Sequence, residues 1–296
     1  MDMDTEFADL RDELFGAAYR MLGSRADAED VLQEAWLRWH RVDRAEVEQP
    51  RAYLFRLVSR LAIDQLRKAK SRRETYIGPW LPDPVLTGPE TDTELAESVS
   101  MALLVVLESL DPVERAVFVL HEAFGFEHAE IADMIGRTER ATRQLGYRAR
   151  RYVQARRPRH RPSPHEHREL TERFIAAALG GDLTVLTQLL SPDVTFWADA
   201  DGTSETPREP IHGMLPVATY LCSVTWAWPP ALGVRPALIN AGPGALVTSR
   251  GEPYMVLSLD IADARIHAVR LILNPAKIAT AIAAVTVVKG RSIEPA

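Results

Sequence analysis

The sequence predicts a multidomain protein in which two small all-α domains precede an α+β domain. With 296 residues, the chain is long enough for two or three domains. Proline-rich stretches at 78–90 and 156–166 divide it, because proline fixes φ and disfavours helix at the preceding residue. Apolar residues recur at helical spacing before the second stretch, whereas short β-rich runs separated by Gly, Pro and Asn follow it.

The first all-α domain is predicted from residues 6–39 and 51–70, which both carry apolar residues at helical spacing. Ser24 precedes an acidic first turn and is therefore expected to cap the N-terminus of a helix. On that helix Asp27 and Glu34 fall on shared or adjacent faces. Spacing alone indicates a solvated surface with ion pairs there.

The second all-α domain contains a predicted helix-turn-helix. A short helix over 128–135 is followed by Gly136 as a turn residue, and Thr138 can cap a second helix that runs to about Tyr152. Arginine can read guanine and glutamine can read adenine by bidentate hydrogen bonds, so the second helix is the expected reader of duplex DNA. Its candidate contacts are Thr138, Arg140, Arg143, Gln144, Tyr147, Arg148 and Arg151. The alternative is an amphipathic helix with a solvated basic face.

The charge pattern favours DNA over that alternative. The chain holds 35 Lys and Arg against 41 Asp and Glu, and this net charge of −6 by itself argues against a nucleic-acid partner. By segment, however, residues 1–50 carry a net charge of −7 and residues 82–133 carry −11, whereas 51–73 carry +7 and 137–161 carry +9. Basic charge is therefore concentrated in two short stretches, where phosphate contacts are expected.

The first basic stretch, over 51–73, interleaves aromatic residues with cations. This composition suits a single-stranded or melted nucleic acid, where exposed bases can stack, but the aromatic residues fit a protein core equally well. The candidate nucleic-acid contacts in this stretch are Arg56, Arg60, Arg67, Lys68 and Lys70.

Cysteine content and hydropathy indicate a cytoplasmic protein. Cys222 is the single cysteine, so neither an intramolecular disulfide nor a cysteine-based metal site is expected. The N-terminus reads as acidic and helical without a signal-peptide pattern, and no apolar run approaches the roughly 18 residues of a membrane span. We expect no membrane contact, no metal and no cofactor.

Three motifs in order resemble the extracytoplasmic-function sigma factors of bacterial RNA polymerase. They are DAEDVLQEAWLRWH, then PRAYLFRLVSRLAIDQLR, then LDPVERAVFVLHEAFGFEHAEIADMIGRT with its basic helix, and the resemblance covers residues 6 to about 157. It implies core RNA polymerase (clamp and flap regions) and promoter DNA as partners. It also implies that the basic residues of 51–73 face the melted minus-ten element and that the second helix of the helix-turn-helix reads the minus-thirty-five element. The positions that match the polymerase-docking motif are Asp27, Glu29, Asp30, Gln33, Glu34 and Leu37.

The first proline-rich stretch narrows the resemblance. It looks like the W-L-P-x-P-x-x-T motif of the sigma-J-like group, here carried by Trp80, Leu81, Pro82, Pro84 and Thr87. That group carries a C-terminal SnoaL-like domain, a cone-shaped α+β barrel that is thought to contact the sigma core and tune its activity. The segment after residue 165 fits this order, with two helices, a strand at 191–202, a helix from about 214 to 226, and three or four strands ending in 267–278.

The sequence departs from the family at several positions. The family often carries Asn at the position of Arg60 and a bulky aliphatic residue at that of Thr142, so the promoter sequence does not transfer. The group's Asp-Gly-Gly-Gly-Lys loop is represented by DADGTSETPRE, and its Asn-Gly-x-Pro-Ala motif by NAGPGAL. The contacts that these motifs make are therefore expected to be altered.

Taken with the resemblance, the sequence predicts a sigma factor regulated by its own C-terminal domain. The expected boundaries are 1–75 for region two, 76–97 for the linker, 98–157 for region four, 158–164 for a second linker, 165–288 for the SnoaL-like domain and 289–296 for a tail.

Two alternatives stay open at this point. One is a ligand-sensing helix-turn-helix regulator that never engages polymerase. The other is an enzyme, because SnoaL-like folds include cyclases with an acid–base residue in an apolar pocket. Candidate pocket residues, for a small-molecule ligand or for catalysis, are Trp197, Asp199, Asp201 and Trp226, with His212 and His267 as further candidates.

Overall fold

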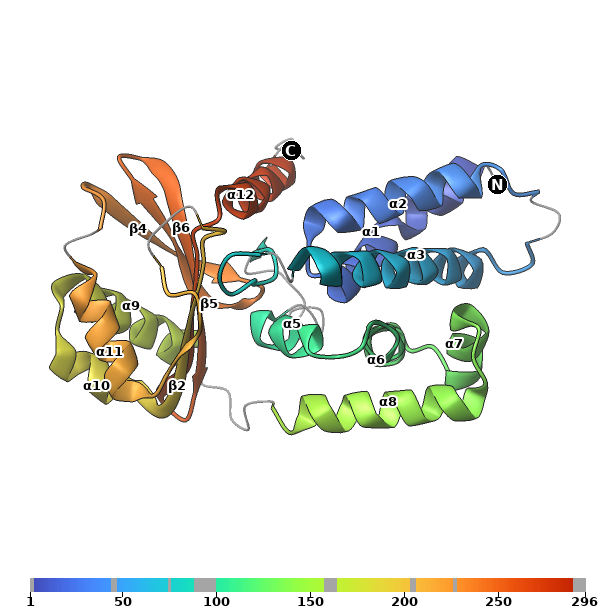
Figure 1. Ribbon diagram of the computed structural model, residues 1–296. Coiled ribbons are helices and arrows are strands. Elements are labelled where there is room, and N and C mark those ends of the chain that lie inside the picture. Colours follow the sequence, from blue (N-terminus) through green and yellow to red (C-terminus); the bar gives the residue numbers. More distant parts are fainter. Residues whose placement is uncertain are drawn as a thin grey trace. The chain divides into compact units, whose positions relative to one another are not determined.

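The computed structural model describes residues 3–43, 47–73, 76–87, 100–156, 164–202, 206–225 and 228–289 (Figure 1). The chain forms two compact units. The helical unit comprises Met1–Thr75 and Leu103–Arg157, and the sheet unit comprises Tyr76–Ala102 and Pro158–Ala296. The first proline-rich stretch therefore belongs structurally to the sheet unit.

The helical unit confirms the all-α prediction for the N-terminal half. Ser24 caps α2, because its hydroxyl accepts a hydrogen bond from the amide of Asp27. Leu14, Trp39 and Leu54 are fully buried, as expected for residues on the apolar faces of α1, α2 and α3. The helices up to the second proline-rich stretch are α1 (Met3–Leu22), α2 (Arg25–Trp39), α3 (Pro50–Arg73), α5 (Met101–Glu108), α6 (Pro112–Phe124), α7 (His128–Ile135) and α8 (Glu139–Gln154).

The sheet unit has the predicted α+β architecture. Its sheet has the strand order β1-β4-β5-β6-β7-β2-β3, and β2 pairs in parallel with β7 whereas the other pairs are antiparallel. The elements are β1 (Leu86–Thr87), α9 (Pro164–Gly180), α10 (Leu183–Leu189), β2 (Leu190–Asp199), β3 (Ile211–His212), α11 (Met214–Ser223), β4 (Leu232–Ile239), β5 (Gly242–Ser249), β6 (Glu252–Ala262), β7 (Arg265–Ile272) and α12 (Pro275–Lys289).

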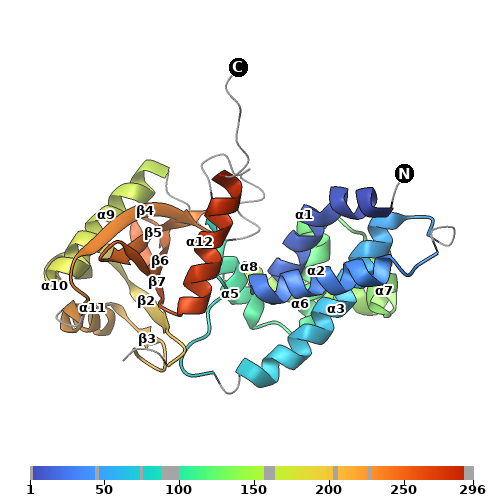
Figure 2. The same cartoon turned by 90° about the horizontal axis from the view of Figure 1, so that it is seen from above.

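The apolar core of the sheet unit lies between the sheet and three helices. Helices α9, α10 and α11 cover one face, and α12 lies on the opposite side of the sheet (Figure 2). Phe174 from α9, Leu186 from α10 and Val217 from α11 pack with Phe196 and Val269 of the sheet. Side chains alternate between the faces of a strand, so the neighbours of Phe196 on β2, Trp197 among them, point to the α12 side.

Two elements of the sheet unit differ from those that the sequence pattern predicted. The last strand was expected to run through residue 278, but it ends at Ile272 and Pro275 begins α12. Proline is favoured at the first position of a helix, and Asn274 caps this one through a hydrogen bond from the amide of Ala276. The second element is β1, which forms within the proline-rich linker and pairs with β4.

Candidate nucleic-acid interface and linker clamp

The helix-turn-helix forms with the predicted turn and caps. Gly136 adopts a left-handed conformation (φ 67°) at the end of α7, a region that glycine enters without steric cost. Thr138 caps α8 by accepting a hydrogen bond from the amide of Ala141. Ala132 is buried, and Thr142 is fully buried with its hydroxyl bonded to the carbonyl of Thr138. Thr142 therefore lies in the packing of the motif and not on its outer face.

The predicted readers of DNA form one exposed face of α8. Residues three or four apart on a helix are neighbours, and the candidates follow this spacing. Tyr147 is 62% exposed although it is a large aromatic residue. The side chains of this exposed face belong to Arg140, Arg143, Gln144, Tyr147, Arg148 and Arg151.

Two of these arginines are held by carboxylates. Arg143 pairs with Glu139 at 2.5 Å on the same helix, and Arg148 pairs with Glu114 of α6 at 2.8 Å. Their side chains are 69% and 65% exposed, so the pairs contribute at most about 1 kcal/mol each. Phosphate oxygens can therefore displace the carboxylates at little cost.

The basic residues of α3 divide into two groups. Arg56 lies over the ring of Tyr53 and Arg67 pairs with the nearby Asp64, and Lys68 is exposed. Arg60 instead donates hydrogen bonds to backbone carbonyls of α7. The side chain of Lys70 lies outside the described residues.

The predicted docking residues on α2 are also not equivalent. Asp30, Gln33 and Leu37 are exposed at helical spacing, and the side chain of Glu34 beside them is 46% exposed and pairs with Arg38. Asp27 is turned toward α3, where its carboxylate accepts a hydrogen bond from Gln65 at 3.0 Å. Glu29 pairs with Arg11 of α1 at 2.7 Å.

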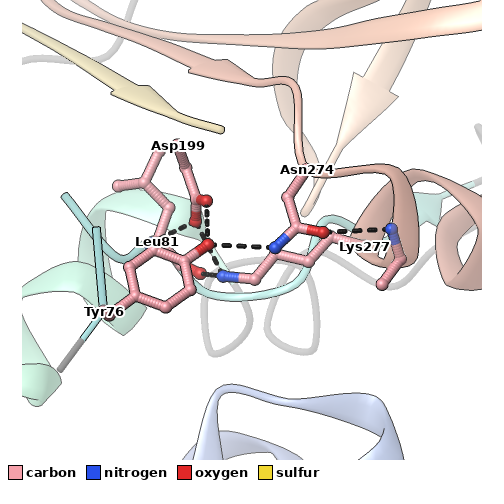
Figure 3. Close-up of polar contacts among 6 residues, drawn as sticks. Tyr76, Leu81, Asp199, Asn274 and Lys277 are labelled. Carbon is pink, nitrogen blue, oxygen red and sulfur yellow. Dashed lines mark hydrogen bonds and ion pairs between the residues drawn. The ribbon is translucent and has the colours of Figure 1, made fainter. Parts of the chain in front are cut away.

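A buried polar cluster holds the linker on the sheet unit (Figure 3). Asp199, at the end of β2, is fully buried. Its carboxylate accepts hydrogen bonds from the hydroxyl of Tyr76 and the amide of Leu81, both in the linker, and pairs at 2.7 Å with Lys277 of α12. Asn274 donates to the hydroxyl of Tyr76 at 2.9 Å. We call this cluster of Tyr76, Leu81, Asp199, Asn274 and Lys277 the linker clamp.

Every charged group of the clamp has both electrostatic and packing contacts within it. The ammonium of Lys277 also donates to the carbonyl of Leu81 and lies 4.1 Å from the ring centroid of Trp80, a cation–π contact. Burial raises the pKa of the Tyr76 phenol, and its hydrogen bond to Asp199 raises that pKa further, so the phenol stays protonated as a donor. Each charge in the clamp thus has an opposite charge and hydrogen-bond partners, as a buried ion pair requires.

A second contact continues the attachment beyond the clamp. The side-chain oxygen of Asn240 accepts a hydrogen bond from the backbone amide of Val85, and the backbone amide of Asn240 donates to the carbonyl of Val85. Leu86 and Thr87 then pair with Ile239 and Leu238 as β1. The linker motif thus follows the sheet with Leu81, Pro82 and Pro84 buried; the side chain of Thr87 lies outside the described residues.

The candidate pocket residues do not act as one group. Asp199 is enclosed by the clamp, whereas Asp201 is exposed at a turn with a positive φ of 48°. The ring centroid of Trp197 lies 5.2 Å from the guanidinium carbon of Arg270. The remaining candidates have other partners or other positions: His212 contacts Thr195, His267 lies 3.5 Å from Asp193, and Trp226 lies outside the described residues.

Sequence reasoning missed most of the clamp. It selected Asp199 and Leu81 for other reasons, but gave no role to Tyr76, Asn274 or Lys277. A signal for Asn274 was present, because Asn followed by Pro is a typical start of a helix. Nothing local could place a lysine 78 residues away against Asp199.

Comparison with known proteins assigns the family. A model of Sigma-70 region 2 matches residues 7–72, and a model of Sigma-70 region 4 matches residues 100–153. The ECF RNA polymerase sigma factor SigJ of Mycobacterium tuberculosis is 39% identical over 288 residues, which cover 92% of each chain. The chain belongs to the ECF RNA polymerase sigma factors.

The similarity of this ECF sigma factor to SigJ includes the sheet unit. The crystal structure of SigJ matches with a TM-score of 0.74 and 37% identity, over 93% of this chain and 98% of that chain. SigI of the same species is 38% identical, over 63% of this chain and 66% of its own. Both region models match within helices α1–α8, so the sheet unit after residue 164 lies beyond them.

Two further findings concern the part of this sigma factor that the structure describes. No helix there is both long and apolar enough to cross a membrane. In the same residues, no three histidine, cysteine, aspartate or glutamate side chains are grouped so that they could hold a metal ion.

Proposed function

We propose that this ECF sigma factor directs core RNA polymerase, in the cytoplasm, to promoters whose minus-thirty-five element is read by α8. The observation that carries the proposal is the uninterrupted exposed face of α8, on which four arginines lie with Gln144 and Tyr147. Helix-turn-helix proteins place such a second helix in the major groove, where Arg and Gln can pair with base edges. Thr138 caps this helix and is near enough to its start to meet a phosphate.

Helix α2 is the proposed docking surface for the polymerase clamp. Asp30, Gln33, Glu34 and Leu37 are at least partly exposed there, and exposed Trp36 adds apolar area. A mixed acidic and apolar patch suits a protein partner, in which aromatic and aliphatic anchors are surrounded by polar groups. We assign Asp27 and Glu29 to holding α2 against α3 and α1, because their carboxylates bond within the helical unit.

Helix α3 is the proposed contact for the melted minus-ten region. Arg56, Arg67 and Lys68 provide positive charge along it. Arg56 already stacks on Tyr53, and such cation–aromatic surfaces also accept unpaired bases. Arg60 and Lys70 are assigned to the same contact by their positions on the helix.

We further propose that the sheet unit regulates the sigma domains through the linker and carries out no catalysis. The linker connects the two matched sigma regions, and the clamp holds it on the sheet unit. A change in the sheet unit can therefore reach both DNA-binding domains through a segment of the chain they share. The carboxylate of Asp199, the strongest candidate acid–base group, is occupied by linker donors and Lys277.

Substitution on α8 tests the DNA-binding assignment. Arg143→Ala and Arg148→Ala should each weaken promoter binding by about 1–3 kcal/mol if they read bases, or lower the salt dependence by about one ion if they contact phosphate. The measurement is promoter affinity of the reconstituted holoenzyme at several salt concentrations. Arg235→Ala is the matched control, because it removes one exposed arginine from β4 of the sheet unit and leaves α8 unchanged. Unchanged affinity and salt slope in both test variants would refute the assignment.

Substitution on α2 tests the assignment of this helix as the polymerase-docking surface. The double variant Asp30→Ala, Glu34→Ala should lose most co-purification with core RNA polymerase, because it removes two charges from the proposed docking face. The control is Asp9→Ala, Asp12→Ala, which removes two exposed charges from α1. Equal recovery of polymerase with both double variants would refute this assignment.

A further inference from the structure

Two stacked histidines lie where α6 and α7 pack against α8. His121 is in the last turn of α6, and His128 is the first residue of α7. Their ring centroids are 4.2 Å apart, and both side chains are half-buried. Nδ1 of His121 lies 2.9 Å from the carbonyl oxygen of Phe126, and because that oxygen only accepts, this nitrogen carries a proton. His121 is thereby held in one orientation, and His128 packs on its ring.

Gly146, in the middle of α8, makes room for His128. A Cβ at position 146 would lie 2.9 Å from Nε2 of His128 and 3.4 Å from Cγ1 of Val117. The first distance is shorter than a van der Waals contact, so only glycine fits there while the imidazole keeps its place. Glycine inside a helix is less favourable than alanine. Helix α8 thus has a weak helix former at the point where His128 contacts it.

The surroundings of His128 disfavour a proton on its ring. Burial lowers the pKa of this imidazole below the ordinary value of about 6.5, and His121 lowers it further. The positive charges of Arg143 and Arg150 on α8 act in the same direction, and Glu127 acts against them. Near neutral pH, His128 is therefore uncharged in the free protein.

The other charged groups around the histidine pair have partners of their own. In the described part of the chain, none of the carboxylates among them bonds to the imidazole of His128. These groups are Glu122 on α6, paired with Arg150; Glu130 on α7, bonded to the amide of Glu127; Glu139 on α8, paired with Arg143; and, on α3, Arg51 over the ring of Phe126 and Arg60 at the last turn of α7.

Duplex DNA on α8 would reverse this electrostatic situation. In helix-turn-helix proteins the second helix enters the major groove, and the first helix crosses the phosphate backbone. His128 belongs to the first helix, and Arg143 belongs to the proposed reading face of the second. Duplex DNA carries one negative charge per about 1.7 Å of its axis. Phosphates there would neutralise the arginines and favour the charged form of the imidazole.

We infer that His128 is a proton-dependent part of the DNA-binding surface, neutral in the free sigma factor and a third cation beside Arg143 and Arg150 when a phosphate backbone lies along α7 and α8. The inference rests on the proposed function, because it requires α8 to bind the minus-thirty-five duplex. Promoter binding then takes up a proton. The bound state holds more protons than the free state, so affinity rises as the pH falls, by at most about tenfold per pH unit for one proton.

The pH range of the effect follows from the two states. In the free protein the pKa of His128 lies below about 6.5, so this proton is largely absent above that pH. In the complex the phosphates raise the pKa of the same group. Affinity increases on acidification between the two pKa values, and it levels off below the lower one because both states are then protonated.

Promoter affinity at several pH values and salt concentrations tests the inference. The reconstituted holoenzyme is titrated with one duplex promoter, which the parent holoenzyme selects from a random library at about pH 7.5. From about pH 7.5 to about pH 6, the affinity of the parent should rise at least about threefold more than that of His128→Gln. The salt dependence of the parent should steepen by about one ion over this range, whereas that of His128→Gln should not change, because an amide takes up no proton.

His212→Gln is the matched control. It removes an exposed histidine from β3 of the sheet unit, so its affinity should change with pH as that of the parent does. Equal pH and salt dependence of promoter binding in the parent and His128→Gln would overturn the inference and leave the proposed function intact. A parent holoenzyme that binds no promoter from the library at any pH would count against the proposed function, and against the inference with it.

The free full-length protein provides a second measurement. NMR of isotope-labelled histidine rings gives the titration midpoint of each imidazole, and the signal missing from His128→Gln identifies His128. Its midpoint should lie below about 6.5, and it should rise in Arg150→Ala, which removes a positive charge from its surroundings. A midpoint at or above about 6.5 that does not move in Arg150→Ala would also overturn the inference, because His128 would then not be kept neutral by its neighbours.

Discussion

Among the described residues of the sheet unit, Asp199 and Lys277 form the most deeply buried ion pair, with side chains 0% and 8% exposed. Taking two charges out of water costs several kcal/mol each, and the cost is recovered only when partners surround both. Tyr76 and Leu81 provide these partners, so the pair is satisfied only while the linker is in place. The linker is therefore part of the structure that makes this pair stable.

Breaking the pair from one side should be costly. Asp199→Asn and Lys277→Met each leave one buried charge without its opposite, and each should destabilise the sheet unit by about 3–5 kcal/mol. The double variant should cost less than the sum of the two. The measurement is native-state hydrogen exchange, including the amide of Leu81. For comparison, Arg38→Ala breaks an exposed pair with Glu34 and should cost less than about 1 kcal/mol.

The same variants measure the regulatory role of the clamp. If the sheet unit acts through the linker, the double variant should change promoter-dependent transcription by the reconstituted holoenzyme. Arg235→Ala, an exposed substitution on β4 of the same sheet, should not. Equal transcription by the double variant and the parent would show that the clamp has only a structural role.

Strand β1 has two residues, and Asn240, in the turn after β4, holds the residue that precedes it. Asn240 holds Val85 by two hydrogen bonds and adopts a positive φ of 50° after β4. Asparagine tolerates this left-handed region better than other residues with a Cβ. Its side chain and its backbone conformation therefore both contribute to attaching the linker.

Two substitutions separate these contributions. Asn240→Gly keeps the left-handed backbone accessible but removes the side-chain acceptor, which should cost about 1 kcal/mol. Asn240→Ala removes the acceptor and also strains the backbone, so it should cost about 1 kcal/mol more. Thermal unfolding together with hydrogen exchange of residues 76–87 measures both effects. Equal loss in the two variants would mean that the backbone conformation contributes nothing.

The elements differ in how far the sequence could predict them. The helix-turn-helix was predicted with its turn and cap because Gly136 and Thr138 act on neighbouring residues. The clamp joins Asp199 to Tyr76 and Lys277, which are 123 and 78 positions away in the sequence. Strand β1 also pairs with a strand far along the chain, so no local sequence pattern predicts either contact. Asp199 was selected for its chemistry as a pocket acid, but its partners, which only the fold brings together, give it a different environment.

For the whole molecule, the net charge of −6 describes neither of the two proposed nucleic-acid surfaces. The +7 of residues 51–73 lies on α3, and +4 of the +9 of residues 137–161 lies on α8; an acidic segment precedes each in the sequence. Opposed charge of this kind allows a protein to attract DNA with selected helices while the molecule as a whole stays acidic.

The attachment of residues 76–87 to the sheet has a consequence for reach. These twelve residues lie between the two sigma regions, and an extended chain covers at most about 3.5 Å per residue. As a fully extended chain these twelve residues would reach about 40 Å, so their attachment to the sheet fixes a large part of the segment that joins the two sigma regions. The sheet unit therefore limits how much of that segment can extend while the clamp is closed.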